Sequence, residues 1–155
     1  MNLPNVLIVL FIAYLIVVMF IYFYQRKLLY HPSENNYLDE TNLNHKIEKI
    51  YVQSDTELIS WYYNNNKSHK TILFFHGNAG RLDNRVYKLN ELAKLNINYL
   101  IVAYRGFSGN QGKPSEEGIY KDSDAAKKWL NENGVDDKNI IPVSYTHLTL
   151  PTIYS

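Results

Sequence analysis

The chain has 155 residues, of which 46% are hydrophobic and 20% charged, and its formal net charge is +1 at pH 7. Its 16 basic and 15 acidic side chains are interspersed, so the sequence has no basic stripe for nucleic acid. Cysteine is absent, which excludes disulfides and cysteine-based metal sites. The hydrophobic content is that of a globular segment and not of a disordered one.

An apolar segment near the N-terminus predicts a membrane anchor. Val6–Tyr24 contains no charge and no strong helix breaker, and as a helix it is long enough to cross the hydrocarbon core. A cleavable signal peptide is the main alternative, but its apolar region is usually about 7–15 residues long and no small-residue cleavage pattern follows here. Arg26 and Lys27 lie just beyond the span, so the positive-inside tendency predicts a single-pass anchor in residues 1–27 and a cytoplasmic soluble part.

The segments that follow predict a β-hairpin and then a buried strand. After a linker at residues 28–46, the β-rich runs Ile47–Val52 and Leu58–Tyr63 flank a short polar turn, a pattern typical of an antiparallel pair. Thr71–Phe75 is a short, almost wholly apolar run, as expected of a strand that is covered on both faces.

The next part of the chain predicts parallel β-α-β units. Asn84–Leu95 carries its apolar residues on one helical face and leads to an apolar run at Asn98–Ala103, so these elements form a crossover and a parallel strand pair. Ser115 is the expected N-cap of a further helix, and Gly134 is its stop signal. A short strand at Asn139–Val143 follows. The fold class is therefore α/β.

The most specific motif follows the strand Thr71–Phe75. A buried strand that runs into His-Gly is where an α/β-hydrolase builds half of its oxyanion hole, because the sharp turn aims a backbone N–H above the sheet. We predict an oxyanion-hole turn at His76, Gly77, Asn78 and Gly80, with Asn78 supplying the N–H. The glycines allow positive φ and close backbone approach. An ordinary loop after a strand is the alternative.

The chain resembles the membrane-anchored Bem-type α/β-hydrolases, which are related to abhydrolase-domain and serine aminopeptidase-like proteins. The resemblance covers roughly Gln25 to Ile141. The sequence departs from the family pattern at two places. Ala103 replaces the usual Asp, and the Gly-x-Ser core is shifted to Phe107-Ser108-Gly109. The resemblance implies the N-terminal half of an α/β-hydrolase fold, a β-hairpin followed by parallel βαβ units, behind one transmembrane helix. The matching segments are Gln25–Pro32, His76–Gly80, Tyr104–Phe107, Gly112–Glu116 and Gly118–Asp122.

The resemblance also implies a serine hydrolase that acts on ester, thioester or amide bonds of a small-molecule or acyl substrate, without a cofactor or metal. In this family the nucleophile, acid and base would all follow residue 141, and the chain contains no Gly-x-Ser-x-Gly elbow. The partial hydrolase domain at 47–141 would thus hold the oxyanion turn, braced by His76, and a motif loop at Tyr104, Arg105 and Gly106, with Arg105 as a loop-fixing donor. We expect no catalytic residue in this chain and no activity of the chain alone.

Residues 142–155 are predicted to be a non-native tail. Ser144–Ser155 contains no glycine, so it cannot form the strained elbow, and it resembles a translated sequencing adapter. A closed α/β-hydrolase usually needs roughly 200 residues or more, which favours a truncated product. The alternatives are a genuine divergent tail, a truncated assembly product, and a non-enzymatic anchored module that binds a partner through its open sheet edge.

Two further patterns have structural interpretations. Ser108 in Gly106-Phe107-Ser108-Gly109 lacks a glycine two positions later and does not end a strand directly, so we do not assign it as a nucleophile. The histidines show no metal-ligand spacing, and no metal site is predicted among them. They are His31, His45, His69, His76 and His147.

Overall fold

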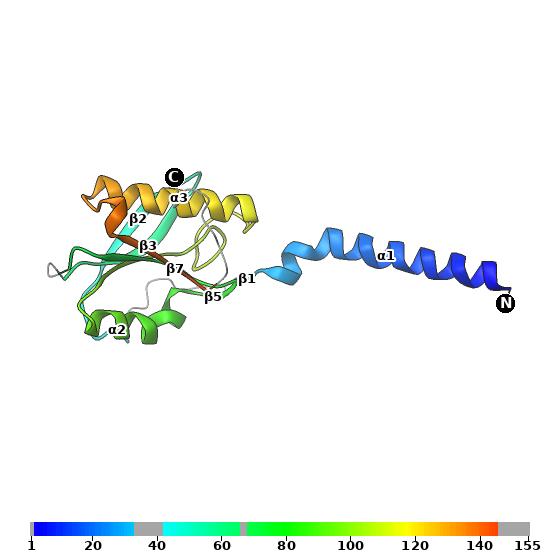
Figure 1. Ribbon diagram of the computed structural model, residues 1–155, viewed down its shortest axis with the longest axis horizontal. Coiled ribbons are helices and arrows are strands. Elements are labelled where there is room, and N and C mark those ends of the chain that lie inside the picture. The colour runs from blue at the N-terminus through cyan, green and yellow to red at the C-terminus, as the bar shows by residue number, and fades with distance from the viewer. Residues whose placement is uncertain (1, 33–41, 66–67, 146–155) are drawn as a thin grey trace. The chain divides into compact units, whose positions relative to one another are not determined.

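The computed structural model describes residues 2–32, 42–65 and 68–145. The chain divides into two compact units, residues 1–31 and residues 32–155, and each is described by itself (Figure 1). The predicted domain boundaries stay predictions. Of the predicted tail, the residues after 145 lie outside the described part of the chain, and Pro142–Ser144 belong to a strand.

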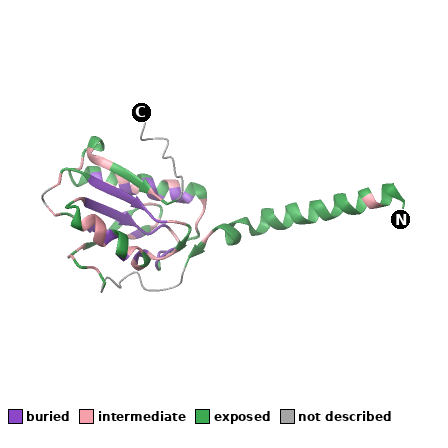
Figure 2. Cartoon of the chain, turned by 60° about the horizontal axis from the view of Figure 1, so that its bottom comes forward, coloured by how far each residue is buried: buried purple, intermediate pink, exposed green. Residues whose placement is uncertain are grey.

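The first unit is one helix, α1, which runs from Leu3 to Leu29. It has no buried residue, and all of its residues are exposed except Val6, whose burial is intermediate (Figure 2). By length and composition it can cross a membrane, and its best window has a mean hydropathy of 3.1. The predicted span Val6–Tyr24 lies inside it. Towards its end Lys27 Nζ lies 5.8 Å from the centre of the Tyr24 ring, a pairing suited to the membrane–water interface.

The second unit contains a five-stranded mixed sheet of strand order β2-β3-β6-β4-β7. The hairpin β2/β3 is antiparallel, as predicted, and β3 also pairs antiparallel with β6. The pairs β6/β4 and β4/β7 are parallel, which confirms the predicted β-α-β arrangement. The strands are β2 (Glu48–Gln53), β3 (Glu57–Tyr63), β4 (Thr71–Phe75), β6 (Asn98–Val102) and β7 (Ile140–Ser144).

The helices α2 and α3 lie on opposite faces of this sheet (Figure 1). The predicted crossover helix begins later than expected, because its first residues form a 3₁₀ turn before α2. Ser115 caps α3 as predicted, since its Oγ accepts from the Gly118 N–H at 3.1 Å. The remaining elements are β1 (His31–Pro32), β5 (Ala79–Gly80), η1 (Leu82–Arg85), α2 (Val86–Lys94), α3 (Glu116–Glu132) and η2 (Asp137–Asn139).

The end of α3 is set by its glycine. Gly134 has φ +84°, and its N–H donates to Asn131 O at 3.1 Å, while the Val135 N–H donates to Leu130 O at 3.0 Å. This pair of bonds satisfies carbonyls that the helix leaves unpaired, and it requires a residue that tolerates the left-handed region. The predicted stop signal is therefore confirmed.

The core lies on both faces of the central strands β4 and β6, all of whose residues are buried (Figure 2). Strands that helices cover on both faces read as continuous apolar runs, which is why these two were recognisable. Strand β7 differs, because Ile141 is 40% exposed and Val143 is 38% exposed. The described sheet therefore has an apolar strand at its β7 edge.

Candidate functional site

The turn after β4 is the predicted oxyanion segment. Strand β4 ends at Phe75, and the chain turns through Gly77 and Asn78 into β5. Among the described residues, a β-carbon at Gly77 would meet one atom within 4 Å, Tyr145 Cβ at 3.7 Å, so the described part of the chain does not crowd this residue. At position 80, by contrast, the backbone conformation itself requires a glycine. Gly80 has φ +86°, and a β-carbon there would lie 2.6 Å from Asn84 Oδ1.

His76 joins this turn to the end of β6. Its side chain is 1% exposed, and its Nε2 accepts from the Tyr104 N–H at 3.1 Å. The proton must then be on Nδ1, which donates to Gly77 O at 2.7 Å. Burial lowers the pKa of His76 to about 4, so the imidazole is neutral at pH 7. Both ring nitrogens are occupied, which makes His76 a brace for the turn and not a general base.

The motif loop after β6 is held by a buried ion pair. Arg105 Nη2 lies 2.6 Å from Asp122 Oδ1, and Asp122, on α3, is fully buried. The Arg105 N–H donates to the same carboxylate at 2.9 Å, and the Ser54 hydroxyl donates to it at 3.0 Å. Gly118 makes room for the arginine, because a β-carbon there would lie 2.6 Å from Arg105 Cδ. Arg105 therefore fixes the loop and is not available to clamp a substrate.

Tyr104 and Gly106 are also structural in this arrangement. Tyr104 is 2% exposed, and its ring stacks on Phe75 at 6.3 Å between ring centres. Gly106 has φ +79°, and a β-carbon there would lie 2.7 Å from Pro114 Cδ. Its N–H donates to the Asn110 carbonyl at 3.2 Å. The contacts of Gly106 close the loop on itself, and the Tyr104 ring packs the loop against the end of β4.

Ser108 lies inside the same loop and has no access to solvent. Its Oγ accepts from the Leu82 N–H at 3.0 Å. The hydroxyl is thus occupied by a backbone contact inside the protein, and that Ser108 is not a nucleophile stays a prediction. Among the described residues, no group of three His, Cys, Asp or Glu side chains could hold a metal ion.

Over most of its length the chain is about one-third identical to several curated proteins. It is 34% identical to uncharacterized protein Rv2307c of Mycobacterium tuberculosis over 80% of this chain and 46% of that protein. It is 31% identical to protein bem46 of Schizosaccharomyces pombe over 83% of this chain and 47% of that protein. With the α/β hydrolase domain-containing protein WAV2 of Arabidopsis thaliana the identity is 32%, over 76% and 42%. No protein-family profile matches the chain.

Solved structures agree on the fold. An α/β hydrolase from Vibrio vulnificus matches 64% of this chain and 35% of its own, with a TM-score of 0.56 and 29% identity. The Pyrococcus furiosus esterase Pf2001 matches 75% of this chain and 48% of its own, with a TM-score of 0.60 and 20% identity, a likeness that shows the fold alone. The chain belongs to the Bem-type α/β-hydrolases. It spans about half the length of the curated relatives it matches.

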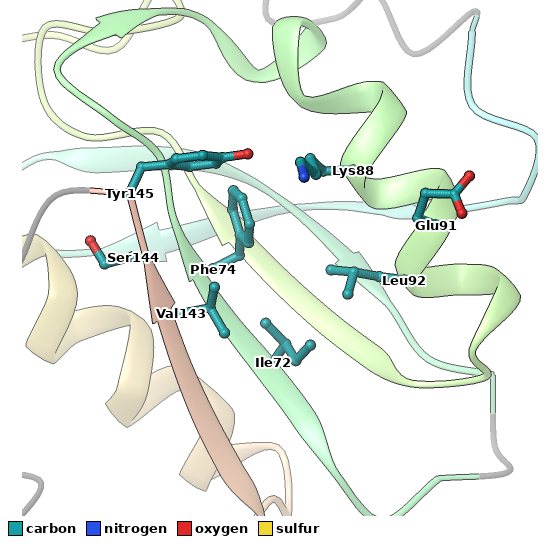
Figure 3. Close-up of a pocket in the computed structure, with 8 residues that line it drawn as sticks. All are labelled: Ile72, Phe74, Lys88, Glu91, Leu92, Val143, Ser144 and Tyr145. Atoms are coloured by element: carbon teal, nitrogen blue, oxygen red, sulfur yellow. The ribbon is translucent and has the colours of Figure 1, made fainter.

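A groove lies on the α2 face of this Bem-type domain, between α2 and β7 (Figure 3). Its volume is about 430 Å³. Phe74 and Val143 form its floor from adjacent parallel strands, and Lys88 and Glu91 approach it from α2. The lining is mainly apolar, and its charged side chains are Lys88 and Glu91. Its lining residues are Ile72, Phe74, Lys88, Glu91, Leu92, Val143, Ser144 and Tyr145.

Sequence reasoning missed Asp122 as the residue that organises the motif loop of the Bem-type domain. A signal for it exists on α3. Ile119, Ala126 and Leu130 form the buried stripe of this helix, and Asp122 lies on the same stripe. A carboxylate within an apolar stripe must have a buried cationic or hydrogen-bonding partner, because an unpaired buried charge is too costly. The pattern therefore predicts a partner, although it does not say which one.

Proposed function

We propose that this domain is the oxyanion-hole part of a membrane-anchored serine hydrolase that acts on ester, thioester or amide bonds. One observation carries the proposal. Strands β4 and β7 are parallel neighbours, so their carboxyl ends lie at the same edge of the sheet, and the Tyr145 N–H donates to Phe75 O at 3.3 Å. A nucleophile in the residues that follow a strand in the β7 position would therefore lie beside the turn at Gly77 and Asn78.

The proposed chemistry is acyl transfer. A serine hydroxyl attacks the carbonyl carbon of the substrate, the carbonyl oxygen becomes an oxyanion, and backbone N–H groups donate to it. In this chain Asn78 supplies one donor and Gly77 leaves space for the acyl group. The neutral His76 holds the turn without adding a charge of its own. Relatives named α/β hydrolase domain-containing proteins, and a structural neighbour named an α/β hydrolase at 29% identity, support this class of reaction.

The test of this proposal is the coding DNA past codon 141, read together with labelling by a fluorophosphonate probe. We expect an in-frame Gly-x-Ser-x-Gly within a few codons, labelling of the protein that contains it, and no labelling of the 155-residue chain. A stop codon confirmed after residue 155 would overturn the hydrolase assignment. If the 155-residue chain were labelled and the label were lost in Ser108→Ala, the prediction that this chain contains no catalytic residue would be overturned.

A membrane-anchored binding module is the second candidate, and the exposed apolar residues of β7 favour it. Ile141 and Val143 leave an apolar surface at this edge of the described sheet. Since the Tyr145 N–H points to β4, the alternation of the ladder points the nitrogen of Pro142 outward. Proline has no N–H to donate, so this edge is a poor template for an added strand, and this candidate would bind its partner through the apolar side chains of β7. A confirmed stop codon would make this candidate the leading one.

The anchor is proposed to place the domain in the cytoplasm, with the lipid bilayer as the partner of Val6–Tyr24. Arg26 and Lys27, in the last turn of α1, support this orientation. The chain carries a glycosylation sequon at Asn66-Lys67-Ser68, on the C-terminal side of the span, which reports the side of the membrane.

In a mammalian host we expect the chain to be recovered from membranes without N-glycan, so that endoglycosidase leaves its gel mobility unchanged. The matched control is Arg26→Glu with Lys27→Glu, in which the positive flank is reversed and a glycosylated fraction appears. That fraction should disappear when Asn66→Gln is added. Glycosylation of the wild-type chain at Asn66 would place the domain on the lumenal side and contradict the proposed orientation.

A further inference from the structure

The loop between β6 and α3 contacts the oxyanion segment on both sides of the turn. On the strand side, the Tyr104 N–H donates to His76 Nε2 at 3.1 Å. On the other side, Ser108 Oγ accepts from the N–H of Leu82 at 3.0 Å, where the chain leaves the turn and enters η1. Leu82 is fully buried, so water cannot replace this acceptor. The turn at Gly77 and Asn78 is therefore held between two fixed points.

Ser108 has a backbone conformation that a serine rarely adopts. Its φ is +52°, in the left-handed region, and the only other non-glycine residue with positive φ in the described part of the chain is Asn96 at +54°. Asn96 follows α2 on the surface, and asparagine is among the residues that tolerate this region. A glycine at position 108 would remove the steric cost but also the hydroxyl. A strained serine that is fully buried points to a requirement for its Oγ.

The loop that carries Ser108 is itself fixed. The Asp122 carboxylate holds Arg105, and the side chain of Asn110 donates to Ala103 O at 2.6 Å and accepts from the Ile59 N–H at 3.0 Å. Because these contacts tie the loop to α3 and to the sheet, Ser108 Oγ is a fixed reference for the segment it binds. A mobile loop could not hold Leu82 in one place.

We infer that Ser108 is a positioning residue, whose hydroxyl sets the place of the oxyanion turn by holding Leu82. The inference rests on the proposed function of that turn. Donors to an oxyanion act only when they lie within hydrogen-bond distance of the place where charge develops, so small displacements of the turn reduce the rate. Ser108 does not touch the substrate and acts through the backbone of the turn.

The test compares two fully buried serines in the full chain in lipid nanodiscs. Ser108→Ala removes the acceptor for Leu82. Ser123→Ala is the matched control, because Ser123 is equally buried and its hydroxyl donates within α3 to Ile119 O at 2.8 Å. The readouts are the amide proton and nitrogen shifts of Gly77 and Asn78, and amide hydrogen exchange over residues 76–82.

In Ser108→Ala we expect the amide shifts of Gly77 and Asn78 to move. Exchange over residues 76–82 should be about tenfold faster than in Ser123→Ala, after each is corrected for global stability from the slowest amides of β6. Ser108→Gly should behave like Ser108→Ala although its backbone is relaxed. This second variant separates the hydroxyl from the strain.

Unchanged Gly77 and Asn78 shifts in both Ser108 variants would overturn the inference, as would equal changes in Ser123→Ala. A turn that stays protected in Ser108→Gly and opens only in Ser108→Ala would also overturn it, because strain and not the hydroxyl would then be responsible. These readouts report on the turn itself and need no catalytic activity. A failed positioning role is thus distinguishable from a failed hydrolase assignment, which the coding DNA and the fluorophosphonate probe decide.

Discussion

Substituting Asp122 by asparagine is expected to lower the free energy of unfolding of the soluble unit by roughly 3–5 kcal/mol. The carboxylate accepts from Arg105 Nη2 at 2.6 Å, from the Arg105 N–H at 2.9 Å and from the Ser54 hydroxyl at 3.0 Å. The Arg105 side chain is only 12% exposed, so water cannot solvate its charge in place of the lost carboxylate. Asp55 lies 3.4 Å from the guanidinium but is 56% exposed, and such a pair compensates little.

The measurement is urea unfolding of the chain in detergent micelles, followed by circular dichroism of the soluble unit with α1 as a constant background. The matched control is Asp124→Asn, which removes the same charge from an exposed position on the same helix and is expected to change the stability by less than about 0.5 kcal/mol. Equal stabilities of the Asp122 and Asp124 variants would show that the buried pair is not what holds the motif loop.

The order of secondary structure was readable from the sequence because its signals are local. The apolar run Thr71–Phe75 is buried along its whole length, the N-cap Ser115 makes its bond within one turn of helix, and Gly134 ends α3 through carbonyls of that same helix. Each of these features depends on residues within a few positions of one another. The β-α-β crossover likewise follows from chain connectivity, since a helix between two strands forces them to be parallel.

The order of the strands in the sheet was not readable in the same way. The sequence predicted the β2/β3 hairpin and the parallel pair of β4 and β6, but it did not predict that β6 lies between β3 and β4. On one side β6 pairs antiparallel with β3, and on the other it pairs parallel with β4. Apolar strands that are covered on both faces carry no side-chain pattern that selects a partner, so tertiary packing decides their order.

The segment before β2 shows a second limit. Residues 28–46 were predicted as a linker, and residues 33–41 lie outside the described part of the chain. The described end of the segment is tied to α2. The Asn90 side chain accepts from the Asn44 N–H at 3.0 Å and donates to Asn42 O at 3.1 Å. His45 also pairs with the Tyr99 hydroxyl. Polar residues such as these look like a solvated linker in sequence, because their partners are more than 40 positions away.

In the candidate site, too, local features could be predicted from the sequence and distant contacts could not. The His-Gly turn was recognisable because a strand, two glycines and a histidine are adjacent in the chain. Its support comes from distant residues, since Tyr104 lies 28 positions from His76 and Ser108 lies 26 positions from Leu82. The sequence could therefore identify the turn, but not the groups that position it.

The burial of His76 predicts that acid destabilises the soluble unit. The folded state lowers the pKa of His76 to about 4, mainly through burial, and an unfolded histidine titrates near 6.5. Between these values the unfolded chain binds more protons than the folded one. The stability that the neutral ring contributes is thus complete above about pH 6.5 and is lost as the pH falls towards 4. The loss from this residue should be about 2 kcal/mol at pH 5 and about 3 kcal/mol below pH 4.

Urea unfolding at pH 7.5 and pH 5, in the wild-type chain and in His76→Gln, isolates this contribution. A glutamine can both donate and accept, but it does not titrate, so the variant should lose about 2 kcal/mol less than the wild type between the two pH values. His45→Gln is the matched control and should keep the His76-dependent loss, although burial also lowers the pKa of His45. A protonated Nε2 of His76 cannot accept from the Tyr104 N–H, so acid should also break the hydrogen bond that fixes the turn after β4. Equal pH dependence in wild type and His76→Gln would mean that folding does not lower the pKa of His76, which would contradict the buried, neutral imidazole.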